Sequence, residues 1–144
     1  MRLYLVAACL LLILVQYACS IGIRPTQSLA VQGKFMCKGK PAKGVKVKIY
    51  DHDTFTLDDK MGETKSDAQG SFYVTGKSNE VTRLTPKMNI YHKCGKLLPI
   101  CYTKFSIGIP KNYLTSGSTP KKTYDAGTFN LDAKMPGQST DCLN

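Results

Sequence analysis

Alternation of apolar and polar side chains most strongly limits the folds open to this chain. The segment 45–50 (VKVKIY) alternates strictly, and the segment 87–94 (KMNIYHKC) repeats the pattern. Successive side chains of a β-strand point to opposite faces, so a period of two is typical of a strand with one buried face. The expected buried side chains are Val45, Val47, Ile49, Met88, Ile90 and His92.

Further alternating segments are separated by residues that favour turns. We expect strands at 29–37, 62–66, 71–75, 101–109 and 124–131, with a hairpin turn at Asp67–Gly70 joining the second and third of these. The residues 21–28 and 133–144 are expected to be loosely structured ends. Since no segment shows an apolar stripe with the helical period, the sequence predicts an all-β, immunoglobulin-like β-sandwich of about seven to eight strands.

The first twenty residues have the pattern of a secretory signal peptide. A short basic start is followed by the apolar run 3–15, which is too short for a membrane span, and by the small residues Ala18 and Ser20. Cleavage between Ser20 and Ile21 would leave a domain of residues 21–144. Loss of Arg2 would lower the formal net charge from +10 to about +9. The protein is therefore expected in the extracellular space.

The cysteines indicate two disulfide bonds. Cys9 and Cys19 lie in the predicted leader, which leaves Cys37, Cys94, Cys101 and Cys142. Four cysteines in a secreted chain allow three connectivities. Strand alternation places Cys94 and Cys101 on the same face of consecutive antiparallel strands. We therefore rank the pairing of Cys94 with Cys101, and of Cys37 with Cys142, first among the three.

Short motifs along the mature chain resemble the nematode transthyretin-like family, secreted proteins with a transthyretin-type sandwich. The matching pieces, in order, are 33–37 (GKFMC), 39–41 (GKP), 45–51 (VKVKIYD), 53–55 (DTF), 58–59 (DD), 62–67 (GETKSD), Gly70, Phe72, 90–94 (IYHKC), 109–113 (IPKNY) and 127–131 (GTFNL). Their order and spacing cover nearly the whole mature chain. The resemblance implies a transthyretin-like β-sandwich.

The resemblance also raises two functions of more distant relatives. Transthyretin carries a hormone in a tetramer channel, and nothing in this sequence specifies that assembly. Hydroxyisourate hydrolases need a first-strand histidine and a Tyr-Arg-Gly-Ser ending. This chain has Gln32 at the former position and ends in Asp141-Cys142-Leu143-Asn144. Glutamine cannot act as a general base, so the sequence predicts a protein that is not an enzyme and has no catalytic residues.

The histidines and aspartates offer weaker candidates. Strand alternation places His92 on the buried face, where we interpret it as a structural residue near a disulfide. His52 is expected to be solvated in a loop with Asp51, Asp53, Asp58 and Asp59. These carboxylates are possible Ca²⁺ ligands but lack the spacing of a known calcium loop. Oxidised cysteines with this spacing do not indicate zinc, so no metal and no cofactor are predicted.

One sheet face carries much of the positive charge. In the transthyretin arrangement, the strands 45–50, 87–94 and 101–109 are neighbours in one sheet. Asn89 lies on the outward face of these strands, together with several lysines and tyrosines. We expect no acidic residue on the same face as that candidate partner-binding set, which is Lys46, Lys48, Tyr50, Lys87, Tyr91, Lys93, Tyr102 and Lys104. Lysines on a solvated sheet also protect against edge pairing, which is the simpler explanation.

Clustered positive charge favours acidic partners. The sequence therefore predicts a secreted binding or adaptor protein, monomeric or weakly dimeric. The resemblance to the transthyretin-like family implies that it bridges cell surfaces or engages host proteins. Its partner would be an extracellular or host protein, an anionic lipid surface or a sulfated glycan, and nucleic acid is not expected. The alternatives are a carrier of a small hydrophobic ligand and, with less support, an enzyme similar to hydroxyisourate hydrolase.

Overall fold

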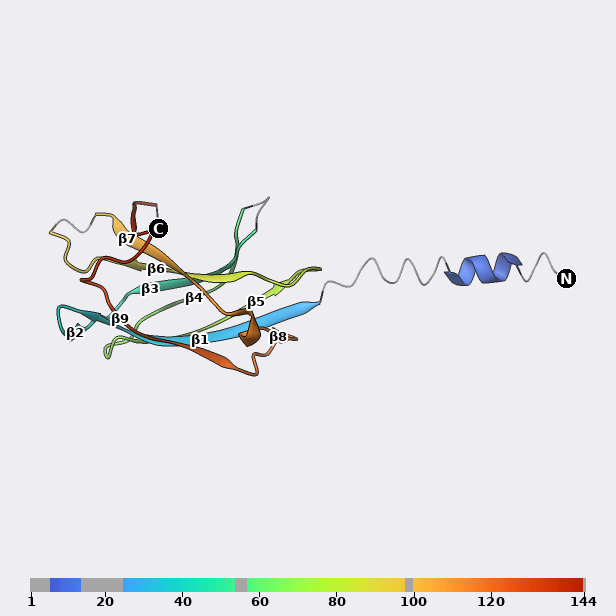
Figure 1. Ribbon diagram of the computed structural model, residues 1–144, viewed down its shortest axis with the longest axis horizontal. Helices are drawn as coiled ribbons and strands as arrows, with labels where there is room; N and C mark the ends of the chain where they lie inside the picture. Colours follow the sequence, from blue (N-terminus) through green and yellow to red (C-terminus); the bar gives the residue numbers. More distant parts are fainter. Residues whose placement is uncertain (1–5, 14–24, 54–56, 98–99, 144) are drawn as a thin grey trace.

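The computed structural model describes residues 6–13, 25–53, 57–97 and 100–143, and it shows two facing β-sheets (Figure 1). Ten strands lie within these residues: β1 (Thr26–Cys37), β2 (Lys40–Pro41), β3 (Lys46–Asp51), β4 (Asp59–Lys65), β5 (Ser71–Asn79), β6 (Pro86–His92), β7 (Tyr102–Gly108), β8 (Thr115–Ser116), β9 (Thr123–Asn130) and β10 (Ser139–Asp141). A single 3₁₀ turn, η1 (Lys111–Tyr113), precedes β8. The predicted all-β sandwich is confirmed, and the short strands β2, β8 and β10 account for the larger strand count.

The first sheet is organised around β1. It contains the antiparallel order β2-β1-β5, and the short strand β8 also pairs with β1. On its other side β1 pairs with β9 in parallel, with a bulge between Gln32 and Lys34. Its inward side chains Leu29, Val31 and Phe35 are fully buried, as the alternation predicts.

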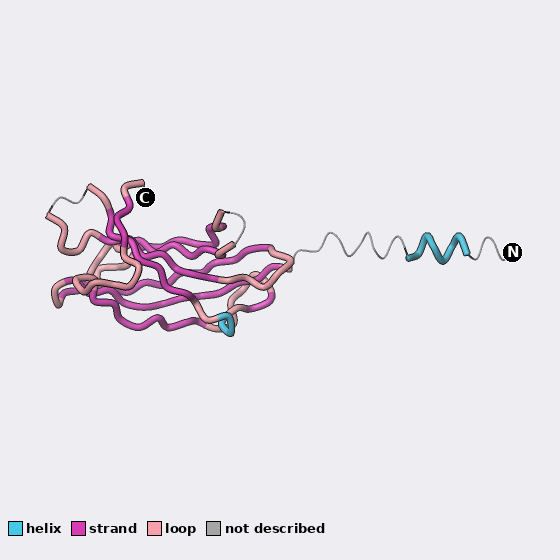
Figure 2. The backbone as a smooth tube through the Cα atoms, turned by 45° about the horizontal axis from the view of Figure 1, so that its top comes forward, coloured by secondary structure: helices cyan, strands magenta, loops and turns pink. Residues whose placement is uncertain are grey.

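The second sheet has the order β10-β7-β6-β3-β4, with every neighbouring pair antiparallel. The predicted adjacency of segments 45–50, 87–94 and 101–109 is confirmed. Figure 2 shows the two layers of strands. The core between them consists of Leu29, Val31, Phe35, Val45, Val47, Ile49, Phe72, Val74, Met88, Ile90, Phe105, Ile109 and Leu131. Burial of this apolar set is the main favourable term in folding.

The predicted hairpin at Asp67–Gly70 is wrong, although the turn itself is present. Asp67 Oδ1 accepts hydrogen bonds from the backbone N–H groups of Gln69 and Ser71, and Gly70 has a φ of 77°. The strands on either side do not pair with each other: β4 pairs with β3, and β5 pairs with β1. The turn therefore carries the chain from one sheet to the other, which a local turn signal cannot reveal.

The edges of the two sheets approach closely where β4 passes β5. A Cβ atom placed on Gly62 would lie 2.1 Å from the carbonyl oxygen of Thr75, and one on Gly76 would lie 2.9 Å from Met61 Cβ. Real Cβ atoms do not approach that closely, so both positions require glycine. The two glycines allow the sandwich to close along this side.

Both predicted loose ends contain strand. Thr26, Gln27 and Ser28 begin β1, and Ser139–Asp141 forms β10 on the free edge of β7. Residues 6–13 of the predicted leader are helical. Among the described residues no helix is both long and apolar enough to cross a bilayer. The cleavage site at residues 20–21 lies outside the described residues, so the leader stays a prediction.

Candidate functional site: a lysine–tyrosine face and its surroundings

The four mature cysteines form two disulfides, but the predicted pairing is wrong. Cys37 bonds to Cys94, and Cys101 bonds to Cys142. The tail supplies the reason, because β10 places Asp141 opposite Tyr102 and the next residue, Cys142, then falls opposite Cys101. Cys94 packs against the core and bridges to β1 in the other sheet.

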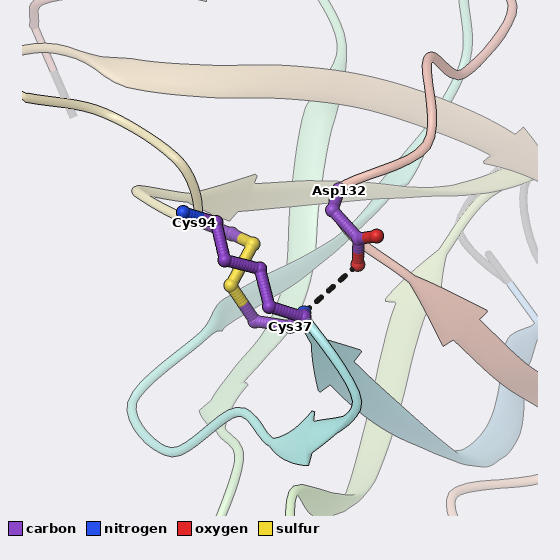
Figure 3. The surroundings of a disulfide bond; sticks show 4 residues. Cys37, Cys94 and Asp132 are labelled. Carbon is purple, nitrogen blue, oxygen red and sulfur yellow. Dashed lines mark hydrogen bonds between the residues drawn. A yellow bond between two sulfur atoms is a disulfide. The ribbon is translucent and has the colours of Figure 1, made fainter.

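The Cys37–Cys94 bridge thus connects the two sheets at one end of the sandwich. Figure 3 shows it beside Asp132, whose Oδ1 accepts a hydrogen bond of 3.0 Å from the backbone N–H of Lys38. That backbone hydrogen bond lowers the pKa of Asp132. Lys38 itself has a φ of 51°, so the carboxylate holds a turn that a lysine rarely adopts. Both disulfides lie at this end, which we call the disulfide end.

Most of the candidate lysines and tyrosines lie together on the outer face of the second sheet. The register pairs Lys46 with Tyr91, Tyr50 with Lys87, and Tyr91 with Lys104 across neighbouring strands. Directly opposed residues of an antiparallel pair project from the same side of the sheet. We call the members that remain grouped, Lys46, Lys48, Tyr50, Tyr91, Lys93, Tyr102 and Lys104, the lysine–tyrosine face.

Tyr91 points outward, yet only 1% of its surface is exposed. The ammonium groups of Lys48 and Lys104 lie 5.3 and 5.6 Å from the centre of its ring, and the edge of Tyr102 packs 6.3 Å away. Burial raises the pKa of the Tyr91 hydroxyl to about 12. The lysine stems therefore cover apolar ring surface while their charged ends remain at the face.

Tyr102 repeats this arrangement beside Tyr91. The ammonium group of Lys93 lies 4.5 Å from its ring centre, and that of Lys46 lies 4.9 Å away. Each of the two rings thus holds two lysine ammonium groups. A cation over an aromatic ring gains roughly 0.5–1 kcal/mol at exposed sites, so these contacts position charges that would otherwise repel each other.

The expected absence of acidic residues on this face is wrong. Glu63 lies opposite Lys48 in the β3–β4 ladder, and Asp141 lies opposite Tyr102 in the β7–β10 ladder. Glu63 forms an ion pair of 3.2 Å with Lys60, and this hydrogen bond, with further attraction from Lys48 and Lys46, lowers the pKa of Glu63. Prediction failed here because β4 and β10 were not recognised as neighbours of the central strands.

Lys87 is positioned differently from the other candidate lysines. Its ammonium group forms an ion pair with Asp58, whose other carboxylate oxygen lies 2.9 Å from His52 Nδ1. Desolvation acts to raise the pKa of Asp58, but the hydrogen bonds from Lys87 and His52 outweigh it and lower that pKa. Lys87 therefore forms an ion pair at the end of the sandwich opposite the disulfides, and we do not count it in the lysine–tyrosine face. We call this opposite end the acidic end.

His92 lies on the buried face beside the Cys37–Cys94 disulfide, as the alternation predicts. It is 4% exposed, packs edge-on against Phe105, and neither ring nitrogen has a hydrogen-bond partner among the described residues. Burial lowers its pKa, and the charge of Lys96 acts in the same direction. His92 also borders a pocket of about 350 Å³, together with Cys37, Val45, Tyr91 and Leu131.

The remaining sequence candidates serve local structure. Asp51 is buried, and its Oδ1 accepts a hydrogen bond of 2.7 Å from the backbone N–H of Thr85. Gln32 Nε2 lies 3.5 Å from Asp125 Oδ2 on the outer face of the first sheet. Within the described ranges, which omit residues 54–56 of the acidic loop, no three His, Cys, Asp or Glu side chains gather as metal ligands would.

Comparison with known proteins agrees with this architecture. The family model described as the transthyretin-like family matches residues 32–110. Transthyretin-like proteins 5 and 2 of Caenorhabditis elegans are 45% and 42% identical to this chain, covering 83% of it in each case and 86% and 84% of their own lengths. Transthyretin-like protein 33 of the same nematode is 41% identical over 88% of this chain and 90% of its own length.

A solved 9R-lipoxygenase from Cyanothece shares a weaker likeness, with a TM-score of 0.42 and 18% identity over 72% of this chain and 16% of its own. That value is too low to support an inference. Fold and surface together define a disulfide-linked β-sandwich with a basic, aromatic sheet face. Its family is shown by the sequence matches: the chain belongs to the transthyretin-like family, which confirms the resemblance seen in the sequence.

Proposed function

We propose that this protein is a secreted, non-enzymatic binding protein that docks an acidic extracellular or host protein on the lysine–tyrosine face. The leader pattern and the two disulfides support secretion, because disulfides persist in oxidising compartments. Gln32, at the position of the hydrolase histidine, supports a role without catalysis.

The observation that carries the proposal is the placement of four ammonium groups over two tyrosine rings. A lysine side chain in solution loses considerable conformational entropy when it is immobilised against a partner. Lysines already resting on rings have lost part of that freedom, so less is lost on binding. A preorganised basic face also raises the association rate with acidic surfaces.

Charge reversal at three lysines tests the proposed face. The triple variant Lys46→Glu, Lys48→Glu and Lys93→Glu should weaken binding to an acidic partner at least tenfold at low salt. The probe is immobilised polyglutamate, followed by proteins captured from extracellular or host extracts. Added salt should reduce wild-type binding, since screening weakens contacts between exposed charges.

A matched control separates the face from total charge. The variant Lys77→Glu, Lys121→Glu and Lys122→Glu changes net charge equally, and these exposed lysines precede or lie on strands of the first sheet. We expect it to retain most of the wild-type affinity. Equal losses in both variants would mean non-specific attraction to a basic protein, and unchanged affinity in the first variant would remove the proposed site.

The absence of catalysis is tested separately. Secreted, oxidised protein should hydrolyse hydroxyisourate no faster than buffer does, and Gln32→His should not by itself create activity, because the ending of the hydrolases is also missing. Turnover above background by the wild-type protein would contradict the non-enzymatic part of the proposal while leaving the docking face untouched.

A second candidate is carriage of a small hydrophobic ligand in the pocket beside His92. Its support is the pocket volume of about 350 Å³, which is within the range of small-ligand sites, and its lining by Val45, Leu131 and the Cys37–Cys94 bridge. Native mass spectrometry of the secreted protein would detect a retained ligand. Substitution of Leu131 by a larger Phe should displace such a ligand, whereas docking on the lysine–tyrosine face should be unaffected.

A further inference from the structure

A cleft of about 540 Å³ lies on the outer face of the first sheet, on the side of the sandwich away from the lysine–tyrosine face. Three strands form its floor, with β1 in the middle, β5 on one side and β9 on the other. Its volume is within the range of small-ligand sites. It shares no residue with the lysine–tyrosine face or with the pocket beside His92, so it is a separate site, which we call the outer cleft.

A β-bulge hollows the outer cleft. While β1 advances from Gln32 to Lys34, its parallel partner β9 advances from Asp125 to Thr128, which inserts one extra residue. Gly127 lies in this bulge with a φ of 78°, and its backbone N–H donates a hydrogen bond of 2.8 Å to Asp125 Oδ1. A Cβ atom placed on Gly127 would meet nothing within 4 Å. The bulge therefore leaves open space above the sheet, and such bulges are common beside functional sites.

Polar side chains cross the cleft in two rows, from β5 through β1 to β9. Residues aligned across neighbouring strands project from the same side of a sheet. The cleft therefore presents amide, ammonium, carboxylate and hydroxyl groups close together. The first row is Tyr73, Gln32 and Asp125, and the second row is Ser71, Lys34 and Thr128.

Tyr73 gives the cleft an apolar wall. Of the aromatic side chains in the described ranges, it alone is mostly exposed, with 55% of its surface open to solvent. Its chain neighbour Phe72 is buried in the core. Because aromatic rings contribute most when they are covered, a lone exposed ring at the side of a polar cleft offers its face to a ligand.

The charges in the cleft are mixed. Asp67 and Asp125 supply two carboxylates, and Lys34 supplies one ammonium group. Each carboxylate uses its Oδ1 to accept backbone N–H groups of its own turn, which leaves Oδ2 as an acceptor for a ligand. A cation would be repelled by the lysine and an anion by the carboxylates. A neutral ligand with several hydroxyls suits both, since each hydroxyl can donate to a carboxylate and accept from an ammonium or amide group.

We propose that the outer cleft binds a neutral sugar, namely a single pyranose ring at the end of a glycan chain. A pyranose has an apolar C–H face, which packs on the ring of Tyr73, and a rim of hydroxyls, which pair with Gln32, Lys34 and the carboxylate of Asp125. The inference goes beyond docking on the lysine–tyrosine face and does not depend on it. Because the two surfaces belong to different sheets, a glycan and an acidic protein do not compete.

Titration followed by nuclear magnetic resonance tests the site. The probes are the methyl glycosides of glucose, galactose, mannose and N-acetylglucosamine, added to ¹⁵N-labelled protein with both disulfides formed. At least one sugar should shift the amide signals of Gly33, Gly127 and Thr128 in a saturable manner. We expect millimolar affinity, since one sugar ring buries little surface. The amide signal of Ile90, in the second sheet, should not move.

Substitutions locate the sugar within the cleft. Tyr73→Ala and Asp125→Asn should each weaken binding at least fivefold, and the asparagine retains the Oδ1 acceptor that holds the bulge. Thr128→Tyr should abolish binding by filling the cleft while leaving the other lining side chains in place. Its matched control is Thr123→Tyr, at an exposed position of β9 outside the cleft, which should bind within twofold of wild type. Unchanged circular dichroism would show that the variants fold.

Three results would overturn the inference. The first is the absence of saturable shifts with all four sugars. The second is sugar binding that survives Thr128→Tyr, which would place the sugar elsewhere on the protein. The third is a response to a zwitterion such as free glycine but to no sugar, which would assign the cleft to charged ligands. Polyglutamate binding by the same variants should equal that of wild type, and it reports on the docking face separately.

Discussion

The two ends of the sandwich are stabilised by different means. At the disulfide end, Cys37–Cys94 and Cys101–Cys142 join strands covalently. At the acidic end, the restraints among the described residues include a part-buried hydrogen bond from the backbone N–H of Thr85 to Asp51 and the ion pair of Asp58 with Lys87. Covalent bonds at the first end offset the repulsion among the like-charged lysines that lie toward it.

That difference also separates the surfaces proposed to bind from those that only stabilise the fold. Most of the lysine–tyrosine face lies toward the disulfide end, whereas Lys87, paired with Asp58, lies at the acidic end. We therefore expect that removing a restraint at the disulfide end and removing one at the acidic end will lower the unfolding free energy by different amounts and will affect binding differently.

The largest effect should come from removing Cys37–Cys94. This bridge spans 57 residues and joins the two sheets, so the variant Cys37→Ser with Cys94→Ser should lose about 4 kcal/mol of unfolding free energy on the chain-entropy estimate. Chemical denaturation of the oxidised proteins measures it. Removing Cys101–Cys142 should cost less, about 2 kcal/mol, because the three-residue strand β10 can detach while the rest stays folded.

Peptide mapping under non-reducing conditions provides the control for that comparison. Fragments containing Cys37 with Cys94, and Cys101 with Cys142, must be recovered from the wild-type protein. A larger stability loss on removing the tail disulfide than on removing the inter-sheet one would contradict the assignment of the main restraint to the sheet-to-sheet bridge.

Along the side where β4 passes β5, close backbone contact holds the two sheets together without a covalent bond. Gly62→Ala should lower the unfolding free energy by about 3 kcal/mol. The added Cβ would meet the carbonyl oxygen of Thr75 at 2.1 Å, so β4 and β5 must move apart and lose packing. Gly108→Ala is the matched control, because nothing lies within 4 Å of its added Cβ and its backbone is not in the left-handed region. A neutral Gly62→Ala in thermal unfolding would show that the sheet edges can adjust.

Local periodicity predicts the sheets well because burial on one face imposes it. The buried faces of β3 and β6 follow the alternation of segments 45–50 and 87–94, and so the lysine–tyrosine face was found from the sequence. Tyr91 departs from simple alternation, since it points outward and is nevertheless buried beneath lysine stems. A pattern of two faces does not reveal that a long cationic side chain can cover an aromatic one.

The sequence does not predict which strands pair when they are far apart along the chain. β10 contains three residues and no apolar alternation, and its position beside β7 determines both the partner of Cys101 and the placement of Asp141 on the basic face. The turn at Asp67–Gly70 carries the signal of a hairpin but joins different sheets. Both errors arose because local geometry does not specify which strand lies across the sandwich.

Loss of the Asp51 carboxylate should have an intermediate effect. Asp51→Ala removes a buried carboxylate and leaves the part-buried N–H of Thr85 without its acceptor, which should lower the unfolding free energy by about 1–2 kcal/mol. Asp59→Ala, at the exposed first residue of β4 opposite Asp51, should change it by no more than about 0.5 kcal/mol. Urea denaturation of both variants measures the difference. Equal effects would indicate that negative charge, and not the hydrogen bond from Thr85 to Asp51, stabilises the acidic end.

The smallest effect concerns His92 at the disulfide end. Because burial lowers its pKa in the folded protein, the unfolded chain binds a proton that the folded chain excludes once pH falls below about 6.5. The stability due to neutral His92 is therefore complete above that pH and decreases as pH falls toward the lowered pKa. Urea denaturation between about pH 7.5 and 5.0 should show this decline before the carboxylates of Asp58 and Glu63 begin to titrate.

His92→Leu should flatten that profile and raise the unfolding free energy at neutral pH by about 1 kcal/mol, because it removes a buried polar group whose ring nitrogens have no partner among the described residues. His52→Leu is the control at the acidic end, where the imidazole is half-exposed and bonded to Asp58. If His92→Leu keeps the wild-type slope between pH 6.5 and 5, the pH sensitivity does not originate at the disulfide end. A marked stability loss at neutral pH would show instead that the imidazole makes a contact essential to the pocket wall.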